Sequence, residues 1–520
     1  MSRKLLPLAL ACAAAPLYAQ RPADPDSLSQ AVRGDTRAWR EANETAIVRE
    51  FVELLRVPNL ASDAANIEKN AKRVAAMLER RGIATRLLDG AGGPPVVYGE
   101  RRAPGATKTI VIYAHYDGQP VDPAQWKDGP WTPTLYDKAL DQGGARIALE
   151  GVTGRFDPEW RLYGRSTSDD KVPAIALAAA LDALNAQKRE LSVNLKIFFE
   201  GEEEAGSPHL RAVLEKNKAL LAADLWLLCD GPVHQTRRPQ VYFGARGVTG
   251  VEITVYGPKR TLHSGHYGNW APNPATLAAH LVASMRDDDG RILIDGFYDD
   301  VRPLSDAERK AVAAIPDNDA ELRTELALGA SEANGAKLAE RILLPALNVR
   351  GISSGYVGDR AANAIAMEAK VSIDFRLVPN ETLDKTRALV ERHLRKQGFF
   401  LVEDIPTDEI RRQHAKVARV RWEPGGYPAS RAEIAAPVSQ AFLRTMDAAF
   451  GQKVVAMPTL GGSIPMNVFE EVLKTPIVGL PLANHDNNQH AANENLRLQN
   501  LWDGIEAYAG LLVRLGLELR

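Results

Sequence analysis

Residues 191–204 read LSVNLKIFFEGEEE, an apolar run that breaks into four glutamates within five positions. Two like charges about 4 Å apart repel by roughly 4 kcal/mol at an effective dielectric near 20. On an open surface, solvent would screen the repulsion between Glu203, Glu204 and their neighbours. At the end of a core strand, these carboxylates need a positive partner, and the segments on either side favour this second arrangement.

The flanking segments alternate between strands and helices. Apolar runs predict buried strands over 109–113 and 225–231, on either side of the strand at 191–199. Between them, a polar turn precedes a strongly apolar stretch that predicts a helix over 172–187. This alternation is typical of an α/β domain. Residues 120–160 are rich in Pro, Gly and Asp and are predicted to form a long loop.

The pattern changes in the middle of the chain. With 520 residues, the chain is too long for one ordinary core. Alternating strands and an amphipathic helix predict an α+β domain over 244–427, after which the α/β pattern returns. We therefore expect an α/β catalytic domain in two parts, 20–243 and 428–520, interrupted by the inserted domain.

The charge balance argues against two classes of partner. The formal net charge is −2, so there is no overall electrostatic attraction for nucleic acid or for an anionic membrane. No segment after the N-terminal stretch predicts a transmembrane helix. The composition is that of a soluble globular protein.

The first 19 residues have the pattern of a secretory signal, with a basic start, an apolar middle and Ala19 before the expected cleavage point. We expect a signal peptide over 1–19 and an exported, periplasmic protein. A lipid anchor through Cys12 is the less favoured alternative. Cleavage would leave Cys229 as the one cysteine, without a disulfide partner.

Residues with metal-ligand chemistry follow the predicted strands or open the predicted helix. Each alone has an ordinary alternative: a surface turn, a solvated face or a helix cap. In an open α/β sheet, however, the carboxyl ends of strands are where ligands bind. Two imidazoles and several carboxylates form a mixed set suited to Zn²⁺ or a similar ion, and two cations would offset the carboxylate repulsion. The residues are His115, Asp117, Asp169, Glu203, Glu204, Asp230 and His490.

The motifs resemble those of the dizinc exopeptidase and amidohydrolase family of carnosinases, peptidase V-like dipeptidases, acetylornithine deacetylase and glutamate carboxypeptidase. They occur in family order as HYDGQP, LYGRSTSDDK, EGEEEAGS, CDG, TLHSG, IDFRLVP and GGSIP, followed by His490. The resemblance implies a zinc-exopeptidase-like catalytic domain with a mostly parallel sheet and an inserted α+β lid and dimerisation domain. Ser166 and Val172 stand where the family usually has glycine, but neither is a ligand position.

The resemblance also implies a ligand set for two zinc ions, with manganese or cobalt as alternative metals. Asp169 would bridge the two ions. His115 and Asp230 would complete one site, and Glu204 and His490 would complete the other.

Two further carboxylates receive roles from the resemblance. Asp117 would accept a hydrogen bond from the far nitrogen of His115 and fix its tautomer. Glu203 would act as general base towards a metal-bridging water and then return the proton to the leaving amine. The peptide bond after Asp169 matches a position that relatives hold in the cis form.

The inserted domain and the later chain supply candidate substrate contacts. His263 matches a histidine that reaches across a homodimer to stabilise the oxyanion. Arg376 matches a residue that clasps the substrate carboxylate, and Ser463 would bond the same end. Asn363 matches a small polar contact, although Ala366 stands where relatives usually have proline.

The function expected from this resemblance is hydrolysis of a dipeptide or short peptide, the small amide substrate being the chief partner. Asp230 favours a dipeptidase, because deacylases and carboxypeptidases of the family tend to carry Glu there. The alternative is an N-acyl-amino-acid deacylase of the same family. A catalytically inactive binding protein is less favoured, because every expected ligand is present.

Overall fold

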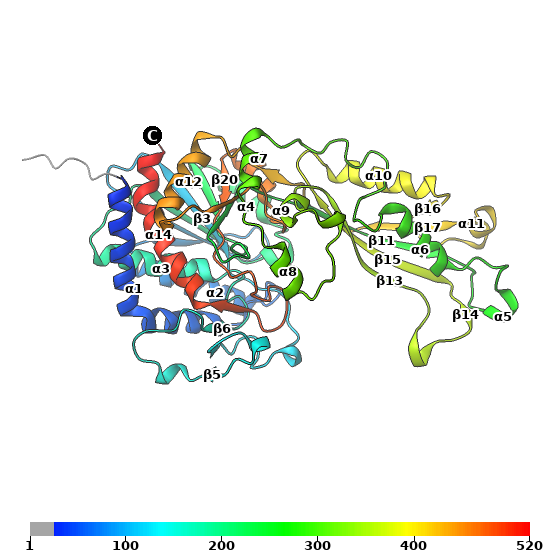
Figure 1. Ribbon diagram of the computed structural model, residues 1–520, viewed down its shortest axis with the longest axis horizontal. Helices are drawn as coiled ribbons and strands as arrows, with labels where there is room; N and C mark the ends of the chain where they lie inside the picture. Colours follow the sequence, from blue (N-terminus) through cyan, green and yellow to red (C-terminus); the bar gives the residue numbers. More distant parts are fainter. Residues whose placement is uncertain (1–24, 520) are drawn as a thin grey trace, which may run out of the picture.

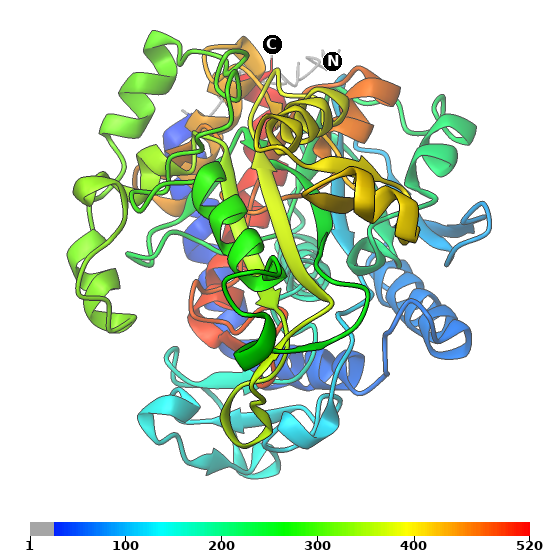
Figure 2. The same cartoon turned by 90° about the vertical axis from the view of Figure 1, so that its right-hand side faces the viewer.

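The computed structural model describes residues 25–519 and shows two parts side by side (Figure 1). The larger part is built on an eight-stranded sheet, and the smaller part extends from it on a five-stranded sheet. Figure 2 looks at the smaller part from its far end, with the larger part behind it. The chain crosses between the parts at two short paired strands, β10 (Gly244–Ala245) and β18 (Ser430–Arg431).

The larger sheet has the order β1-β2-β7-β3-β8-β20-β9-β19, and its central strands β7, β3, β8 and β20 run parallel. The predicted α/β class with a mostly parallel sheet is confirmed. The bounds are β1 (Ala84–Leu88), β2 (Val96–Arg101), β3 (Thr109–His115), β7 (Asn194–Glu200), β8 (Leu225–Leu228), β9 (Gln240–Tyr242), β19 (Val455–Met457) and β20 (Ile477–Gly479).

Both faces of this sheet are buried, because successive residues of a strand point to opposite sides. Ile110 and Ile112 of β3 join the core on one face, whereas Val111 and Tyr113 join the core on the other. Four long helices pack together over the first face: α1 (Pro25–Leu55), α3 (Val172–Ala186), α12 (Pro437–Phe450) and α14 (Leu498–Glu518). Helices α4 (Leu210–Lys216) and α13 (Met466–Leu473) cover the other, while α2 (Ala64–Glu79) packs on β1 and β2.

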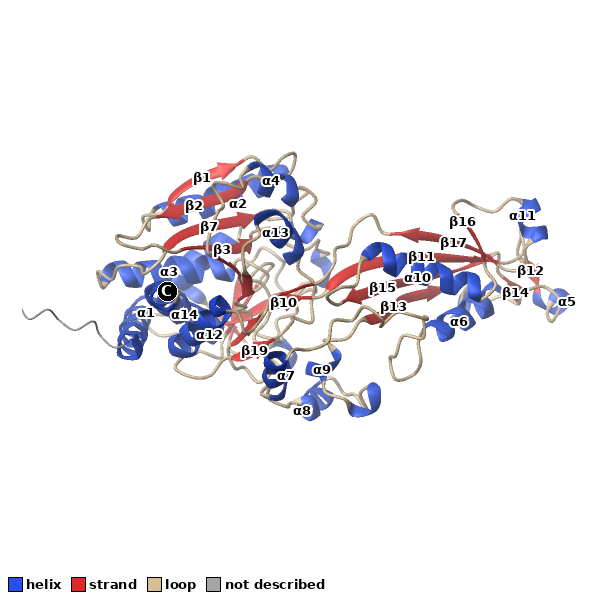
Figure 3. Ribbon diagram, turned by 90° about the horizontal axis from the view of Figure 1, so that it is seen from above, coloured by secondary structure: helices blue, strands red, loops and turns tan. Residues whose placement is uncertain are grey.

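The smaller part is a sheet with helices on one side (Figure 3). Its strand order is β13-β15-β11-β17-β16, and β11 and β15 pair antiparallel over ten residues each. Helices α6 (Pro274–Met285) and α10 (Leu383–Lys396) contribute to its own hydrophobic core. The strands are β11 (Gly247–Tyr256), β13 (Ala346–Ser353), β15 (Glu368–Leu377), β16 (Phe400–Val402) and β17 (Val417–Trp422).

The predicted loop over 120–160 is only partly a loop. It contains β4 (Thr134–Tyr136) and β5 (Arg146–Ile147), which join β6 (Arg161–Tyr163) and β21 (Asn495–Arg497) in a four-stranded sheet. These strands have two or three residues, too few for an alternating pattern. Pairing of β6 with a strand at the far end of the chain stabilises them, and a local pattern does not reveal such a partner.

The expectations about the signal peptide, membrane spans and cysteines can be compared with the described part of the chain. The predicted signal peptide over 1–19 and Cys12 lie outside the described residues. Within residues 25–519, none of the helices is long and apolar enough to cross a membrane. Cys229 is buried and forms no disulfide.

Close packing of β20 against β9 generates a test of the core. A Cβ atom at Gly479 would overlap the ring of Tyr242, which is fully buried. We expect Gly479→Ala to destabilise the protein by about 1–3 kcal/mol through overpacking. Gly34→Ala in α1 is the control, because nothing lies within 4 Å of its added methyl group. Equal denaturation midpoints for the two variants would contradict the packing argument.

Candidate metal centre

The predicted ligands gather at one edge of the larger sheet. His115 is the last residue of β3, and the short 3-10 turn η4 (Glu203–Ala205) begins three residues after β7. Asp230 follows β8 by two residues, and Asp169 lies just before α3. Because β3, β7 and β8 are parallel, their carboxyl ends meet at the same edge.

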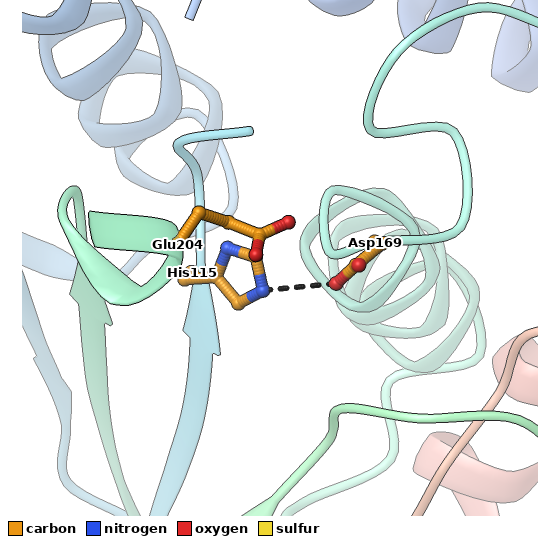
Figure 4. A group of neighbouring side chains, drawn as sticks. All are labelled: His115, Asp169 and Glu204. Carbon is orange, nitrogen blue, oxygen red and sulfur yellow. Dashed lines mark hydrogen bonds and ion pairs between the residues drawn. The ribbon is translucent and has the colours of Figure 1, made fainter. Parts of the chain in front are cut away.

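Asp169 lies between two imidazoles. Its Oδ1 is 3.1 Å from Nε2 of His115, and its Oδ2 is 3.2 Å from Nε2 of His490. Glu204 Oε2 is 3.4 Å from the same nitrogen of His490. His115, Asp169 and Glu204 offer ligand atoms that all lie within 4.8 Å of one another (Figure 4). One carboxylate facing a histidine on each side is the arrangement that a bridging ligand requires.

Asp117 holds both sides of this group together. The backbone N–H of Glu203 donates to its Oδ1 at 3.1 Å, and that of Glu204 donates to its Oδ2 at 3.0 Å. Nδ1 of His115 lies 3.3 Å from Oδ1 of Asp117, which is fully buried. Asp117 therefore lies beside the histidine and also fixes the turn that carries the two glutamates.

Glu494 fixes the loop that presents Asp169. Its Oε1 accepts from the backbone N–H groups of Ser168 at 2.9 Å and Asp169 at 3.0 Å. Its Oε2 accepts from the Ser166 N–H at 2.9 Å and from Arg165 Nη1 at 2.8 Å. The Glu494 side chain is fully buried. Since His490 lies four residues earlier, one segment both supplies a predicted ligand and holds a second in place. The Asp169–Asp170 peptide bond is cis, as the resemblance implies.

The centre has an excess of negative charge that suits divalent cations. Burial, together with the charge of Asp169, raises the pKa of Glu204 and the pKa of Asp230. Burial alone would raise the pKa of Asp169. His115 and His490 lower it by more, so the pKa of Asp169 lies below its ordinary value. Oδ2 of Asp169 is buried and lies 3.2 Å from His490 Nε2, but this contact lacks hydrogen-bond geometry, and no other group among the described residues satisfies the oxygen. The oxygen and nitrogen donors therefore fit two divalent metals, whose charge would offset this repulsion.

The centre opens into a cavity of about 530 Å³. Asp169, Glu203, Asp230 and His490 line it, and two predicted substrate residues line the same cavity. These are Arg376 and Ser463, which are joined by a hydrogen bond of 2.8 Å from Arg376 Nη1 to Ser463 Oγ. A guanidinium in this position has the chemistry to bind a carboxylate.

His263 and Asn363 lie elsewhere. Strand β12 (Leu262–His263) pairs with β14 (Ala364–Ile365), and the Ser264 N–H donates to the Asn363 carbonyl at 2.9 Å. Both side chains are exposed at the far end of the smaller part, beside α5 (Ser264–Tyr267) (Figure 1). The structure brings these two residues together and places them away from the metal centre of their own chain.

Three contributors are not among the predicted site residues, and of these only Gln119 lies in a quoted motif, HYDGQP. Glu494 is distinguished only by its position shortly after His490. Gln119 Nε2 donates to Glu204 Oε2 at 2.7 Å, and Arg246 Nε donates to the Gly461 carbonyl at 2.8 Å. Burial, followed by the charge of Arg376, lowers the pKa of Arg246 to about 10. Contacts between distant segments create the roles of Glu494 and Arg246, so a motif search does not find them.

The Glu494 contacts generate a test. Glu494 accepts five hydrogen bonds, the four above and one from the Ser168 hydroxyl at 3.4 Å, so Glu494→Gln turns an oxygen that accepts at least two of them into an NH₂ group. We expect the variant to fold but to bind zinc about 10–100-fold more weakly, as for loss of other ligand-orienting groups. Calorimetric zinc titration measures this loss. Glu159→Gln, at a half-exposed ion pair, is the control. Unchanged affinity in Glu494→Gln would show that the loop holds Asp169 without it.

Comparison with known proteins gives consistent similarities. The Cys-Gly metallodipeptidase of Schizosaccharomyces pombe is 28% identical over 464 residues, covering 87% of this chain and 89% of the relative. The human Beta-Ala-His dipeptidase is 27% identical over 431 residues, covering 81% and 78%. Among solved structures, the M20 family metallo-carboxypeptidase Sso-CP2 from Sulfolobus solfataricus has a TM-score of 0.72 at 28% identity, covering 91% and 99%.

The location predicted from the first 19 residues is wrong. The yeast Cys-Gly metallodipeptidases to which this chain is similar are cytosolic enzymes, which contradicts the prediction of an exported, periplasmic protein. The short apolar stretch after a basic start was the sole support for that prediction. A short apolar stretch reflects only the local amino-acid composition, and by itself it does not establish that a protein is exported.

The family follows from the extent of the match. The sequence profile of peptidase family M20/M25/M40 matches residues 111–514. This span runs from β3 to α14 and includes every predicted ligand and substrate residue. The chain belongs to peptidase family M20/M25/M40.

Proposed function

We propose that this protein is a zinc-dependent dipeptidase. The observation that carries the proposal is the position of Asp169 between His115 and His490, in the lining of a cavity that Arg376 also lines. The similar proteins include a Cys-Gly metallodipeptidase and a Beta-Ala-His dipeptidase, both of which are named for dipeptides. We infer a substrate of the same size for this chain.

The ligand set of the proposal follows the geometry around Asp169. Asp169 would bridge two zinc ions, with His115 and Asp230 on one and Glu204 and His490 on the other. When bound, two such ions polarise a carbonyl group and lower the pKa of water. The chain itself holds these ligands in place through Asp117 and Glu494.

Glu203 would serve as the general base. Its carboxyl group lines the cavity, and its backbone is fixed by Asp117. Burial and the charges of Asp230 and Glu204 raise the pKa of Glu203. Cations in the centre would lower that pKa, leaving a carboxylate able to take a proton from the attacking water. Glu203 would then return the proton to the leaving amine.

Arg376 and Ser463 would fix the other end of the substrate. Their hydrogen bond holds the Arg376 guanidinium beside the Ser463 hydroxyl, which also donates to the Gly247 carbonyl at 3.3 Å, and the guanidinium would receive the substrate carboxylate. A free carboxylate beside the cleaved bond is a property of a dipeptide or of an N-acyl amino acid. Asp230, rather than Glu, at the third ligand position favours the dipeptide.

Residues 244–427 would act as a lid and dimerisation domain. His263 and Asn363 lie at its far end, so they would serve the metal centre of a partner subunit in a homodimer. Trp270 and Tyr356 belong to the same domain and are 80% and 65% exposed, and burial against a partner would remove this apolar surface from water.

The first test is amine release from a dipeptide panel and from matched N-acetyl amino acids. We expect the zinc-loaded protein to cleave dipeptides and to lose this activity with a chelator. Glu203→Gln should retain zinc yet lose about 10²–10⁴-fold in kcat. Glu202→Gln is the matched control, because Glu202 bonds His209 outside the cavity. Preferential deacylation would reassign the substrate, and chelator-resistant activity would exclude the metal mechanism.

The second test uses two tags to isolate heterodimers. If His263 acts on the partner, pairing a Glu203→Gln chain with a His263→Ala chain leaves one complete centre of two and about half the wild-type activity. Placing both changes on one chain, paired with wild type, should leave neither centre complete. The reverse pattern would show that His263 acts within its own subunit.

A further inference from the structure

A helical segment of the smaller part forms one wall of the catalytic cavity. This segment, residues 305–344, is here called the arm and contains α7 (Asp306–Ala313), α8 (Asp319–Glu325) and α9 (Leu338–Arg341). It leaves the smaller part and lies beside β19 of the larger sheet (Figure 3). No predicted catalytic or binding residue lies in the arm.

Contacts of the first helix of the arm, α7, fix its N-terminal end. Glu308 in α7 is buried and accepts from Arg302 at 2.7 Å, with Arg431 Nε at 2.9 Å from the same oxygen. The Ser305 hydroxyl and the Glu308 carboxylate form a reciprocal cap on α7. These buried contacts anchor the arm where the two parts of the molecule meet.

Further contacts fix the end of the arm that faces the cavity. Oδ2 of Asp319 accepts from the Leu338 N–H at 2.9 Å, which holds the start of α9 against the start of α8. Ile342 packs against the core of the larger part, together with Ala339. The arm therefore presents a defined surface to the cavity.

That surface is mostly apolar, although Asn318 and Asp319 of the arm also line the cavity. Ile315, Leu338 and Ile342 of the arm line the cavity together with Leu460 of the larger part. Leu338 and Ile342 are four residues apart around α9, so they lie on the same side of it. Leu338 is 43% exposed, unlike the well-buried Ile315, so a large apolar side chain is left facing solvent at this wall. Covering such a side chain with an apolar ligand group is favourable.

The apolar wall adjoins the end of the cavity assigned to the substrate carboxylate. A Cβ atom on Gly461 would lie 3.4 Å from Cγ2 of Ile342. Gly461 is two residues before Ser463, which is bonded to Arg376. The substrate residue whose carboxylate binds there is the C-terminal one, so its side chain is the part nearest to Ile342 and Leu338.

We propose that the arm forms a specificity subsite for a large apolar side chain on the C-terminal residue of the dipeptide. The assignment rests on the dipeptidase activity proposed above and adds the class of its preferred substrate. Glycine at this position would leave Leu338 in water, whereas leucine or phenylalanine would cover it. A basic side chain is the rival, because Asp319 also lines the cavity.

The experiment compares kcat/KM for Ala-Gly, Ala-Leu, Ala-Phe and Ala-Lys with the zinc-loaded enzyme. We expect Ala-Leu and Ala-Phe to be preferred over Ala-Gly by at least about tenfold, the range that apolar pockets achieve. Leu338→Ala should reduce that preference at least about threefold, mainly through a higher KM for Ala-Leu than for Ala-Gly. Leu328→Ala is the matched control, since Leu328 is an exposed arm leucine that does not line the cavity.

The outcomes separate this proposal from the activity on which it rests. If the enzyme cleaves dipeptides but shows no preference for Leu over Gly, or prefers Ala-Lys, the apolar subsite is wrong and the dipeptidase function stands. A preference for leucine that survives in Leu338→Ala also overturns the role of the arm. If zinc-loaded protein cleaves none of the dipeptides, the proposed function itself fails, and the subsite fails with it.

Discussion

The placement of Asp169 between His115 and His490 is the interaction on which the rest of the site depends. Each carboxylate oxygen faces one imidazole, while Glu203, Glu204 and Asp230 crowd the same buried edge of the sheet. Such an arrangement is electrostatically unfavourable unless cations neutralise it. The negative charge that destabilises the fold without cations is therefore what makes the centre suited to two divalent metals.

The fold meets this constraint with supports that are themselves buried. Asp117 uses both oxygens to fix the turn of Glu203 and Glu204, and Glu494 uses both oxygens to fix the loop of Asp169. Four helices cover the sheet face on which α3 packs, so these loops start from rigid elements. Accurate ligand placement thus depends on the packed sheet as well as on the ligands.

Much of this arrangement could be predicted from the sequence where the signal is local. Apolar runs placed β3, β7 and β8, and their parallel order brings His115, Glu203 and Asp230 to one edge. The sheet formed by β4, β5, β6 and β21 escaped prediction, because its strands are short and β21 lies over 300 residues from β6. Glu494 and the arm escaped prediction for the same reason. Their roles come from contacts between distant segments, which a linear motif does not contain.

The proposed reaction requires three sources of side chains around one substrate. The larger part would supply the metal ligands and the base, and the junction with the smaller part would supply Arg376 and Ser463. The third source is the pair His263 and Asn363, which lies at the far end of the smaller part. A single chain therefore has the charged centre and Arg376 in one cavity, whereas its own His263 lies far from both. Since stabilisation of the oxyanion usually lowers the barrier of such a reaction more than any other single effect, assembly with a second subunit would complete the site.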